Sequence, residues 1–195
     1  MPVCKECLLR TVGPVETFCM ICGNSEPCAL HPGGPYCFSA SLYGGATKDV
    51  VHAMKYEGAR DIARIMGEAL AGLASERGFL SADVLVPIPL HRGSERDYNQ
   101  ALAIARGAAR IGGIPVADVL FWSGSLPRQA MKSVRSDRML PRGAISSRRG
   151  LPPNTRVFLV DDVYTTGSTI NAARKALEDD GLIVAGAMVW SRSRG

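Results

Sequence analysis

The sequence predicts an α/β protein with a mostly parallel sheet flanked by helices, joined to a small N-terminal cysteine-rich module. Short apolar runs alternate with longer amphipathic stretches from residue 41 onward, and this alternation is typical of parallel sheets. All six cysteines lie before residue 39. Two acids follow the apolar run at 155–160, at the end of a strand where parallel sheets bind ligands. We therefore expect the module over residues 1–38 and an α/β domain over 39–195.

Hydrophobic periodicity predicts the elements of the α/β domain. Apolar residues over 48–73 form one helical stripe, which breaks near Gly58. The run at 82–87 is apolar and predicts a strand buried in a parallel sheet. The remaining expected elements, in chain order, are a helix over 99–111, an apolar run over 115–121, a loop with a short strand over 123–153, a strand over 155–160, a helix over 168–180 and a strand over 182–190.

Composition and length indicate a cytoplasmic protein. The chain has 195 residues, of which 46% are apolar, enough for one domain and a small appendage. It has no uninterrupted apolar run of about 18 residues, so we expect no membrane insertion. The first residues, MPVCKECLLRTV, lack the apolar core of a signal peptide. In the cytoplasm we expect the cysteines to be metal ligands or reduced thiols.

The N-terminal cysteines predict a zinc ribbon. Two CxxC pairs are separated by eleven residues, and each pair can offer two sulfurs to a tetrahedral Zn²⁺. A segment this short cannot bury enough apolar surface to fold without a metal or a partner. Cys28, Cys37 and His31 either replace one pair or are not ligands, and Pro32 favours a loop residue at His31. The predicted ligands are Cys4, Cys7, Cys19 and Cys22.

Positive charge is concentrated between residues 121 and 150. The whole chain has a formal charge of +5, but this segment holds seven basic residues opposed only by Asp137. Such an excess favours an anionic partner, either phosphate or nucleic acid, and a solvated loop is the alternative interpretation. The basic residues are Arg128, Lys132, Arg135, Arg138, Arg142, Arg148 and Arg149.

The stretch VFLVDDVYTTGST at 157–169 indicates a ligand site. A strand brings Asp161 and Asp162 to its tip, and a small hydroxyl-rich turn then leads into a helix. The N–H groups of such a turn suit a phosphate, and paired carboxylates suit sugar hydroxyls beside a Mg²⁺ ion. A simple helix cap after a core strand is the alternative. The turn consists of Thr165, Thr166, Gly167, Ser168 and Thr169.

This stretch resembles the 5-phosphoribosyl-1-pyrophosphate (PRPP) binding motif of type I phosphoribosyltransferases, in which apolar residues and two acids precede a Thr/Gly-rich phosphate loop. The resemblance implies that Asp161 and Asp162 are the catalytic carboxylates, which hold the ribose 2′- and 3′-hydroxyls while Mg²⁺ binds with PRPP. It implies that the turn at 165–169 holds the 5′-phosphate. Thr165 replaces the Asp that serves the base in 6-oxopurine salvage enzymes, so we do not expect hypoxanthine–guanine salvage.

A resemblance to the ComF family covers nearly the whole chain. The matching segments are Lys55-Tyr56, VPIPLH at 86–91, RDYNQ at 96–100, and the stretch from Gln129 to GAI at 143–145. ComF-family proteins join an N-terminal zinc ribbon to a domain like that of the type I phosphoribosyltransferases. The resemblance therefore implies structural Zn²⁺ in the N-terminal module and PRPP with Mg²⁺ in the larger domain.

The strand at 82–87 leads into a segment that resembles the pyrophosphate-binding loop of these enzymes. This implies Pro87, Arg92 and Arg96 as ligand-binding residues. The chain departs from the family at Asp97, which replaces a Gly, and at Leu140, which replaces an Asn in the loop that would close over PRPP.

Two functions stay open at this stage. The first is Mg²⁺-dependent transfer of a phosphoribosyl group to an unidentified acceptor, which would make the chain an enzyme. The second is a non-enzymatic PRPP-binding module that also binds single-stranded DNA or DNA-uptake proteins, in natural transformation or DNA metabolism. A redox or zinc-storage role for the cysteines would leave the match at 157–169 unexplained.

Overall fold

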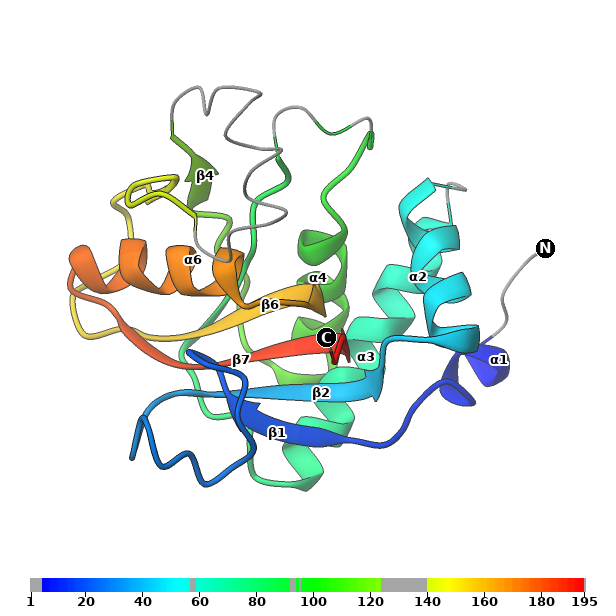
Figure 1. Cartoon of the computed structure of the whole chain (residues 1–195). Coiled ribbons are helices and arrows are strands. Elements are labelled where there is room, and N and C mark those ends of the chain that lie inside the picture. The colour runs from blue at the N-terminus through cyan, green and yellow to red at the C-terminus, as the bar shows by residue number, and fades with distance from the viewer. Residues whose placement is uncertain (1–4, 57–58, 92–93, 95, 124–139, 195) are drawn as a thin grey trace.

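The computed structural model describes residues 5–56, 59–91, 94, 96–123 and 140–194. Its main sheet has the strand order β1-β2-β7-β6-β3 (Figure 1). Every neighbouring pair in this sheet is parallel except β1 and β2. The predicted mostly parallel α/β fold is therefore confirmed. The strands are β1 (Glu16–Cys19), β2 (Tyr36–Leu42), β3 (Val84–Pro87), β6 (Arg156–Tyr164) and β7 (Ile183–Arg192), with β4 (Leu120–Trp122) and β5 (Ile145–Ser147) forming a separate antiparallel pair.

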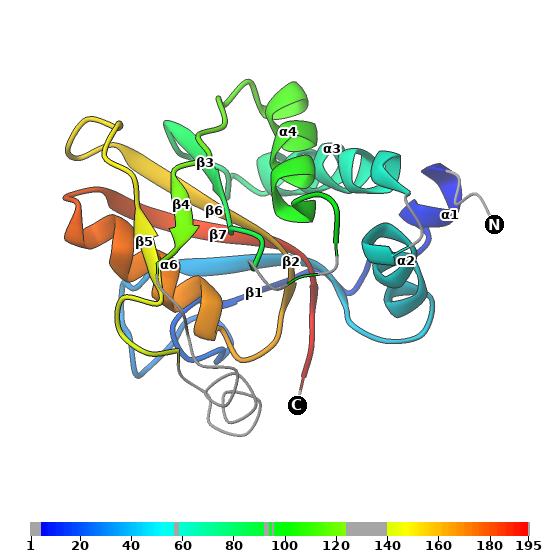
Figure 2. The ribbon, with the colours of Figure 1, turned by 90° about the horizontal axis from the view of Figure 1, so that it is seen from above.

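Helices cover both faces of the main sheet (Figures 1 and 2). Alternate residues of a strand point to opposite faces, so in β6 Phe158 and Val160 pack in one apolar cluster while Val157 and Leu159 pack in the other. The first cluster contains residues of α2, α3 and α4, and the second contains residues of α6. The helices are α1 (Lys5–Leu9), α2 (Gly45–Tyr56), α3 (Arg60–Glu76), α4 (Gln100–Gly112) and α6 (Ser168–Asp179).

Most predicted elements are present, with shifted ends. The helical stretch at 48–73 is divided into α2 and α3 at the predicted break. Within the run at 115–121, Val116 forms only an isolated bridge with Leu85, and β4 begins at Leu120. The short strand expected within 123–153 is β5. Among the described residues, no helix is long and apolar enough to cross a bilayer.

The strand predicted at 155–160 continues to Tyr164 as β6. Asp161 therefore lies inside the strand, opposite Val189 of β7, rather than after the strand end. Both acids therefore belong to the strand, since Asp161 and Val163, on either side of Asp162, pair with β7. This fixes their direction more firmly than a loop would.

The cysteine-rich residues contribute to the main sheet. β1 pairs with β2, and β2 pairs with β7, so this part of the chain forms one edge of the sheet. The boundary predicted between residues 38 and 39 falls inside β2. The division into units over 1–38 and 39–195 stays a prediction.

Two glycines allow α3 and α4 to pack closely. A Cβ at Gly67 would overlap the carbonyl oxygen of Ile104, and a Cβ at Gly107 would overlap that of Arg64. Gly72 of α3 differs, since a Cβ there would meet nothing within 4 Å. The close contact between these helices therefore requires glycine at both positions.

We expect Gly107→Ala to lower the free energy of unfolding by about 2 kcal/mol or more, because the added methyl group would push α4 away from α3. Gly72→Ala is the matched control, and greater helix propensity should raise stability by about 0.5–1 kcal/mol. Urea unfolding of both variants tests this. Equal effects of the two substitutions would contradict the close packing.

Candidate functional site

Two adjacent carboxylates near the carboxyl end of β6 form the centre of the candidate site. Asp162 is buried, and its Oδ2 lies 2.7 Å from Nζ of Lys55, which α2 supplies. Asp161 is less buried, and its Oδ1 accepts a hydrogen bond of 2.8 Å from the backbone N–H of Asp162. The arrangement supplies one ammonium group for two acids, so negative charge is left at the site.

The pKa of Asp161 is raised by its burial and by the second acid. Burial and the neighbouring Asp162 raise the pKa of Asp161 to about 7, against the smaller opposing effects of the Asp162 N–H, Lys55 and Arg96. Burial disfavours the charged form of a carboxyl, and a like charge nearby disfavours it further. The pair would gain stability from a cation or from hydroxyl donors at this point.

The acids line a cleft of about 230 Å³ together with residues that follow β3. Arg96 donates hydrogen bonds to Ser94 Oγ (2.8 Å) and to Gln100 Oε1 (3.0 Å). Asn99 donates from Nδ2 to the carbonyl of Ile88 at 3.0 Å, and its Oδ1 caps α4. These hydrogen bonds hold the side chains of Arg96 and Asn99 in the lining of the cleft. The lining residues include Lys55, Ile88, Arg96, Asn99, Gln100, Trp122, Asp161, Asp162 and Thr169.

The hydroxyl-rich turn joins β6 to α6. Gly167 has φ +76°, a conformation that favours glycine, and a Cβ there would overlap the Tyr164 hydroxyl. No side chain caps α6 at Gly167, and the exposed Thr166 hydroxyl lies 2.7 Å from that of Ser168. The turn therefore presents hydroxyl groups and a helix N-terminus, which together suit an anion.

The structure brings together several of the predicted ligand-binding residues. Asp161, Asp162, Arg96 and Thr169 line the same cleft, and Pro87 ends β3 directly before it. Arg92 lies outside the described residues. Sequence reasoning missed Gln100 as a site residue, although its place in the RDYNQ segment beside Arg96 offered a signal.

A second cluster is formed by Cys19, Cys22, Cys28 and His31, whose ligand atoms all lie within 4.8 Å of one another. The Cys22 and Cys28 sulfurs are 3.5 Å apart, and Cys19 Sγ is 3.5 Å from His31 Nδ1. Tetrahedral zinc with Zn–S bonds of about 2.3 Å separates its ligand atoms by about 3.8 Å. The four residues therefore fit a structural zinc ion.

The cluster revises the predicted ligand set. Cys19 and Cys22 belong to it as predicted, but Cys28 and His31 complete it. The other predicted ligands are untested, since Cys4 lies outside the described residues and the side chain of Cys7 is not described. The missed signal is spacing: Cys28 and His31 are separated by two residues, as Cys19 and Cys22 are.

The pKa values of Cys28 and Cys37 are shifted in opposite directions. Burial acts to raise the pKa of Cys28, but hydrogen bonds with His31 and Cys22 outweigh it and lower the pKa to about 6. Burial raises the pKa of Cys37 well above its usual value. Metals bind thiolates, so Cys28 suits a ligand, whereas Cys37 is a buried thiol of β2.

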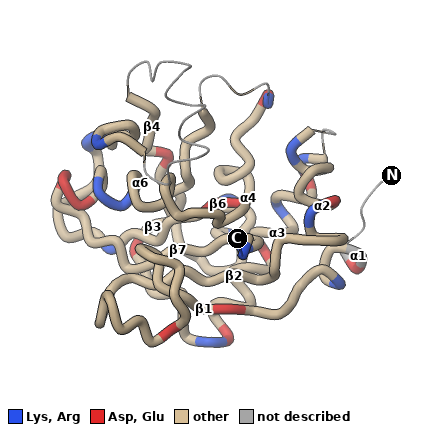
Figure 3. Tube along the Cα trace, viewed as in Figure 1, with Lys and Arg blue, Asp and Glu red and all other residues tan. Residues whose placement is uncertain are grey.

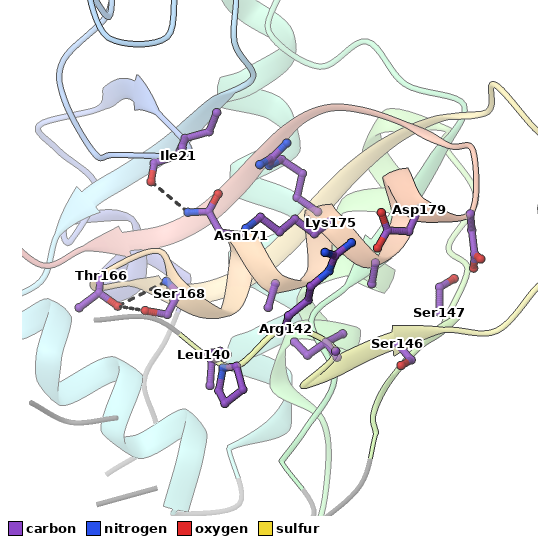
Figure 4. A pocket seen from close by; sticks show the side chains of 17 residues that line it. Ile21, Leu140, Arg142, Ser146, Ser147, Thr166, Ser168, Asn171, Lys175 and Asp179 are labelled. Atoms are coloured by element: carbon purple, nitrogen blue, oxygen red, sulfur yellow. Dashed lines mark hydrogen bonds between the residues drawn. The ribbon is translucent and has the colours of Figure 1, made fainter. Parts of the chain in front are cut away.

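The loop that carries the Cys/His cluster is bonded to the hydroxyl-rich turn and to α6. Tyr164, which precedes the turn, donates from its hydroxyl to the carbonyl of Met20 at 3.3 Å. Asn171 of α6 donates to the carbonyl of Ile21 at 3.0 Å (Figure 4). Arg192 of β7 donates to the carbonyl of Gly23. Three carbonyl groups of this loop are therefore hydrogen-bonded to side chains that flank the turn or lie in β7.

Comparison with curated proteins identifies the class. No known protein-family profile matches the chain. An adenine phosphoribosyltransferase of Leuconostoc citreum is 32% identical over 134 residues, which cover 65% of this chain and 70% of that protein. The chain belongs to the phosphoribosyltransferase family.

The chain is also similar to the competence protein ComFC, as the sequence motifs predicted. The protein of Bacillus subtilis is 26% identical over 145 residues, covering 73% of this chain and 58% of that protein. The protein of Streptococcus pneumoniae is 30% identical over 98 residues, covering 50% and 42%. The chain therefore spans about half the length of these two relatives.

Solved structures with a similar fold have low sequence identity to this chain. Adenine phosphoribosyltransferase from Thermoanaerobacter pseudethanolicus is 17% identical, with a TM-score of 0.46 over 69% of this chain and 81% of that chain. UMP synthase of Leishmania donovani is 18% identical, with a TM-score of 0.43 over 95% of this chain and 30% of that chain.

We expect purified protein to hold about one zinc ion per chain, because four ligand atoms complete a tetrahedral site. Cys28→Ser and His31→Ala should each lose the metal, as measured by elemental analysis, whereas Cys37→Ser should retain it. A variant with Cys4→Ser and Cys7→Ser should also retain it. Loss of zinc from that variant would restore the ligand set predicted from the two CxxC pairs.

The pKa of Asp161 predicts how stability depends on pH. Its pKa is raised above the unfolded value, so between about pH 4 and pH 7 the unfolded chain binds fewer protons than the native protein, and stability falls as pH rises. Asp161→Asn removes this loss. Its stability relative to wild type should grow by up to about 1.4 kcal/mol per pH unit in that window.

Urea unfolding at about pH 5 and about pH 7.5 measures this difference. Asp179→Asn, at an exposed acid in α6, is the control and should show no such growth. A difference between Asp161→Asn and wild type that does not change with pH would refute the raised pKa.

Proposed function

We propose that the chain binds PRPP in the cleft at the carboxyl end of β6. The observation that supports this most is that Asp161 and Asp162 line one cleft together with Thr169 of the turn at 165–169 and with Arg96. The similarity to the adenine phosphoribosyltransferase of Leuconostoc citreum adds support. Carboxylates, a phosphate-binding turn and a guanidinium match the three polar parts of PRPP.

Each part of the site would bind one part of this ligand. The turn of Thr165, Thr166, Gly167, Ser168 and Thr169 would hold the 5′-phosphate with N–H and hydroxyl donors. Asp161 and Asp162 would accept hydrogen bonds from the ribose 2′- and 3′-hydroxyls. The segment from Pro87 to Arg96, with Arg92, would bind the pyrophosphate through its guanidinium groups.

The carboxylates also suit Mg²⁺, whose preferred ligands are oxygens. The raised pKa of Asp161 supports this fit, because a cation would relieve the repulsion between the two acids. When bound, Mg²⁺ would neutralise charge on the pyrophosphate and so favour its departure. Zn²⁺ in the Cys/His cluster would have a structural role.

The reaction that fits this site is transfer of the phosphoribosyl group to an acceptor of unidentified structure. The bond between ribose C1 and the pyrophosphate oxygen would break, and a bond from C1 to the acceptor would form. Positive charge develops on the ribose ring as pyrophosphate leaves. The carboxylates of Asp161 and Asp162 would stabilise that charge because they are already held in place.

A second function, without catalysis, is supported by the basic segment at 121–150 and by the similarity to ComFC, which is named for competence. Arg142, Arg148 and Arg149 are exposed in the described part of this segment. Residues 124–139 lie outside the described residues. In this role the chain would bind PRPP and single-stranded DNA in the cytoplasm and act with DNA-uptake proteins.

Calorimetric titration of PRPP with Mg²⁺ tests the proposed ligand. We expect a variant with Asp161→Asn and Asp162→Asn to bind about 100-fold more weakly, since it loses two charge-assisted contacts. The matched control carries Asp179→Asn and Asp180→Asn, also adjacent acids, and should bind like wild type. Absence of PRPP binding to wild type would reject the ligand.

A titration of single-stranded DNA at two salt concentrations separates the two functions. Binding that weakens with salt but survives in the Asp161 and Asp162 variant would favour the DNA-binding module. Release of pyrophosphate during an acceptor screen would favour the enzyme.

A further inference from the structure

A groove runs along α6 on the other side of the hydroxyl-rich turn from the cleft. It has a volume of about 600 Å³, within the range of small-molecule sites. Its walls are α6 and the segment 140–147, which includes β5 (Figure 4). PRPP in the cleft would leave this groove empty, so the groove calls for a separate explanation.

The turn is a shared wall between the two cavities. Thr169 lines the cleft beside Asp161 and Asp162, whereas Thr166 and Ser168 line the groove. A phosphate held by the turn, as proposed above, would therefore have the ribose on one side and the groove on the other. A group attached to that phosphate would extend along α6.

Two basic side chains lie in the middle part of the groove, between the turn and Asp179. Arg142 and Lys175 are exposed, project from opposite walls (Figure 4), and form no ion pair among the described parts of the chain. Arg174 also lines the groove, but its guanidinium is paired with Glu178 at 2.6 Å. Arg142 and Lys175 are thus available to a second phosphate.

Apolar surface lines the groove along its length. Leu140 lies beside Thr166 and Ser168, more apolar surface comes from Ala172 and Ala176 of α6 and from Ile145 of β5, and Asp179 lies at the far end with Ser147 (Figure 4). Figure 3 likewise shows basic positions on α6 followed by acidic positions at its carboxyl end. From Ser168 to Asp179 the helix advances about 16 Å, which is more than one phosphate group needs.

We propose that this site accepts a ribose 5-phosphate whose phosphate is extended by a second phosphate and a nucleoside, that is, a nucleoside diphosphate ribose. The inference rests on the proposed binding of ribose 5-phosphate at the turn. Arg142 and Lys175 bind the second phosphate, and the apolar surface covers the base. Asp179 and Ser147 accept hydrogen bonds from the hydroxyls of the nucleoside.

Calorimetric titration with ADP-ribose and with ribose 5-phosphate tests the groove. Wild type should bind ADP-ribose at least about tenfold more tightly, because only ADP-ribose reaches Arg142 and Lys175. A variant with Arg142→Gln and Lys175→Gln should lose this preference and keep its affinity for ribose 5-phosphate within about twofold. The control carries Arg77→Gln and Arg156→Gln, which remove the same charge from exposed positions outside the groove.

The outcomes separate this inference from the proposed function. If wild type binds both probes equally, or if the preference survives in the groove variant, the groove does not bind the extension, while binding of ribose 5-phosphate leaves the proposed function intact. If neither probe binds and PRPP does not bind, both proposals fail. Equal losses in the groove variant and the control would show a general charge effect and would also overturn the inference.

Discussion

The ion pair between Lys55 and Asp162 is the interaction on which the candidate site depends. It joins α2 to the carboxyl end of β6, two elements that are far apart in the sequence, through a contact of 2.7 Å with little solvent exposure. Removing one partner of a buried pair leaves an uncompensated charge, which is far more costly than the pair itself is stabilising. The lysine therefore allows a strand to carry two acids side by side, while Asp161 remains without an equal partner.

The main sheet sets the position of the backbone that carries the two acids. Parallel pairing with β3 and β7 holds β6 on both sides as far as Val160, and pairing with β7 alone continues from Asp161 to Tyr164. The two apolar clusters hold the sheet between α6 on one face and α3 and α4 on the other. The two acids are thus held by strand backbone rather than by a loop.

The sequence predicted helix starts, breaks and turns, because these depend on neighbouring residues. The break between α2 and α3, the start of α4 near Asn99 and the turn around Gly167 each depend on residue types within a few positions. The participation of β1 and β2 in the main sheet was not predictable in this way, because strand pairing joins residues far apart in the chain. The same holds for Lys55 as the partner of Asp162. The Cys/His cluster shows an intermediate case: the spacing of Cys28 and His31 was visible, but the fold of the loop decided which ligands come together.

Hydrogen bonds join the cysteine loop to the hydroxyl-rich turn and α6, so they would couple metal binding to the proposed binding of phosphate. Tyr164 and Asn171 hold carbonyl groups of the loop while they fix the turn and α6. Thermodynamic linkage is reciprocal. If bound metal raises the affinity of the turn for phosphate, bound phosphate raises the affinity of the loop for the metal by the same factor. In a cell short of zinc, abundant phosphorylated sugar would therefore protect the protein from losing its metal.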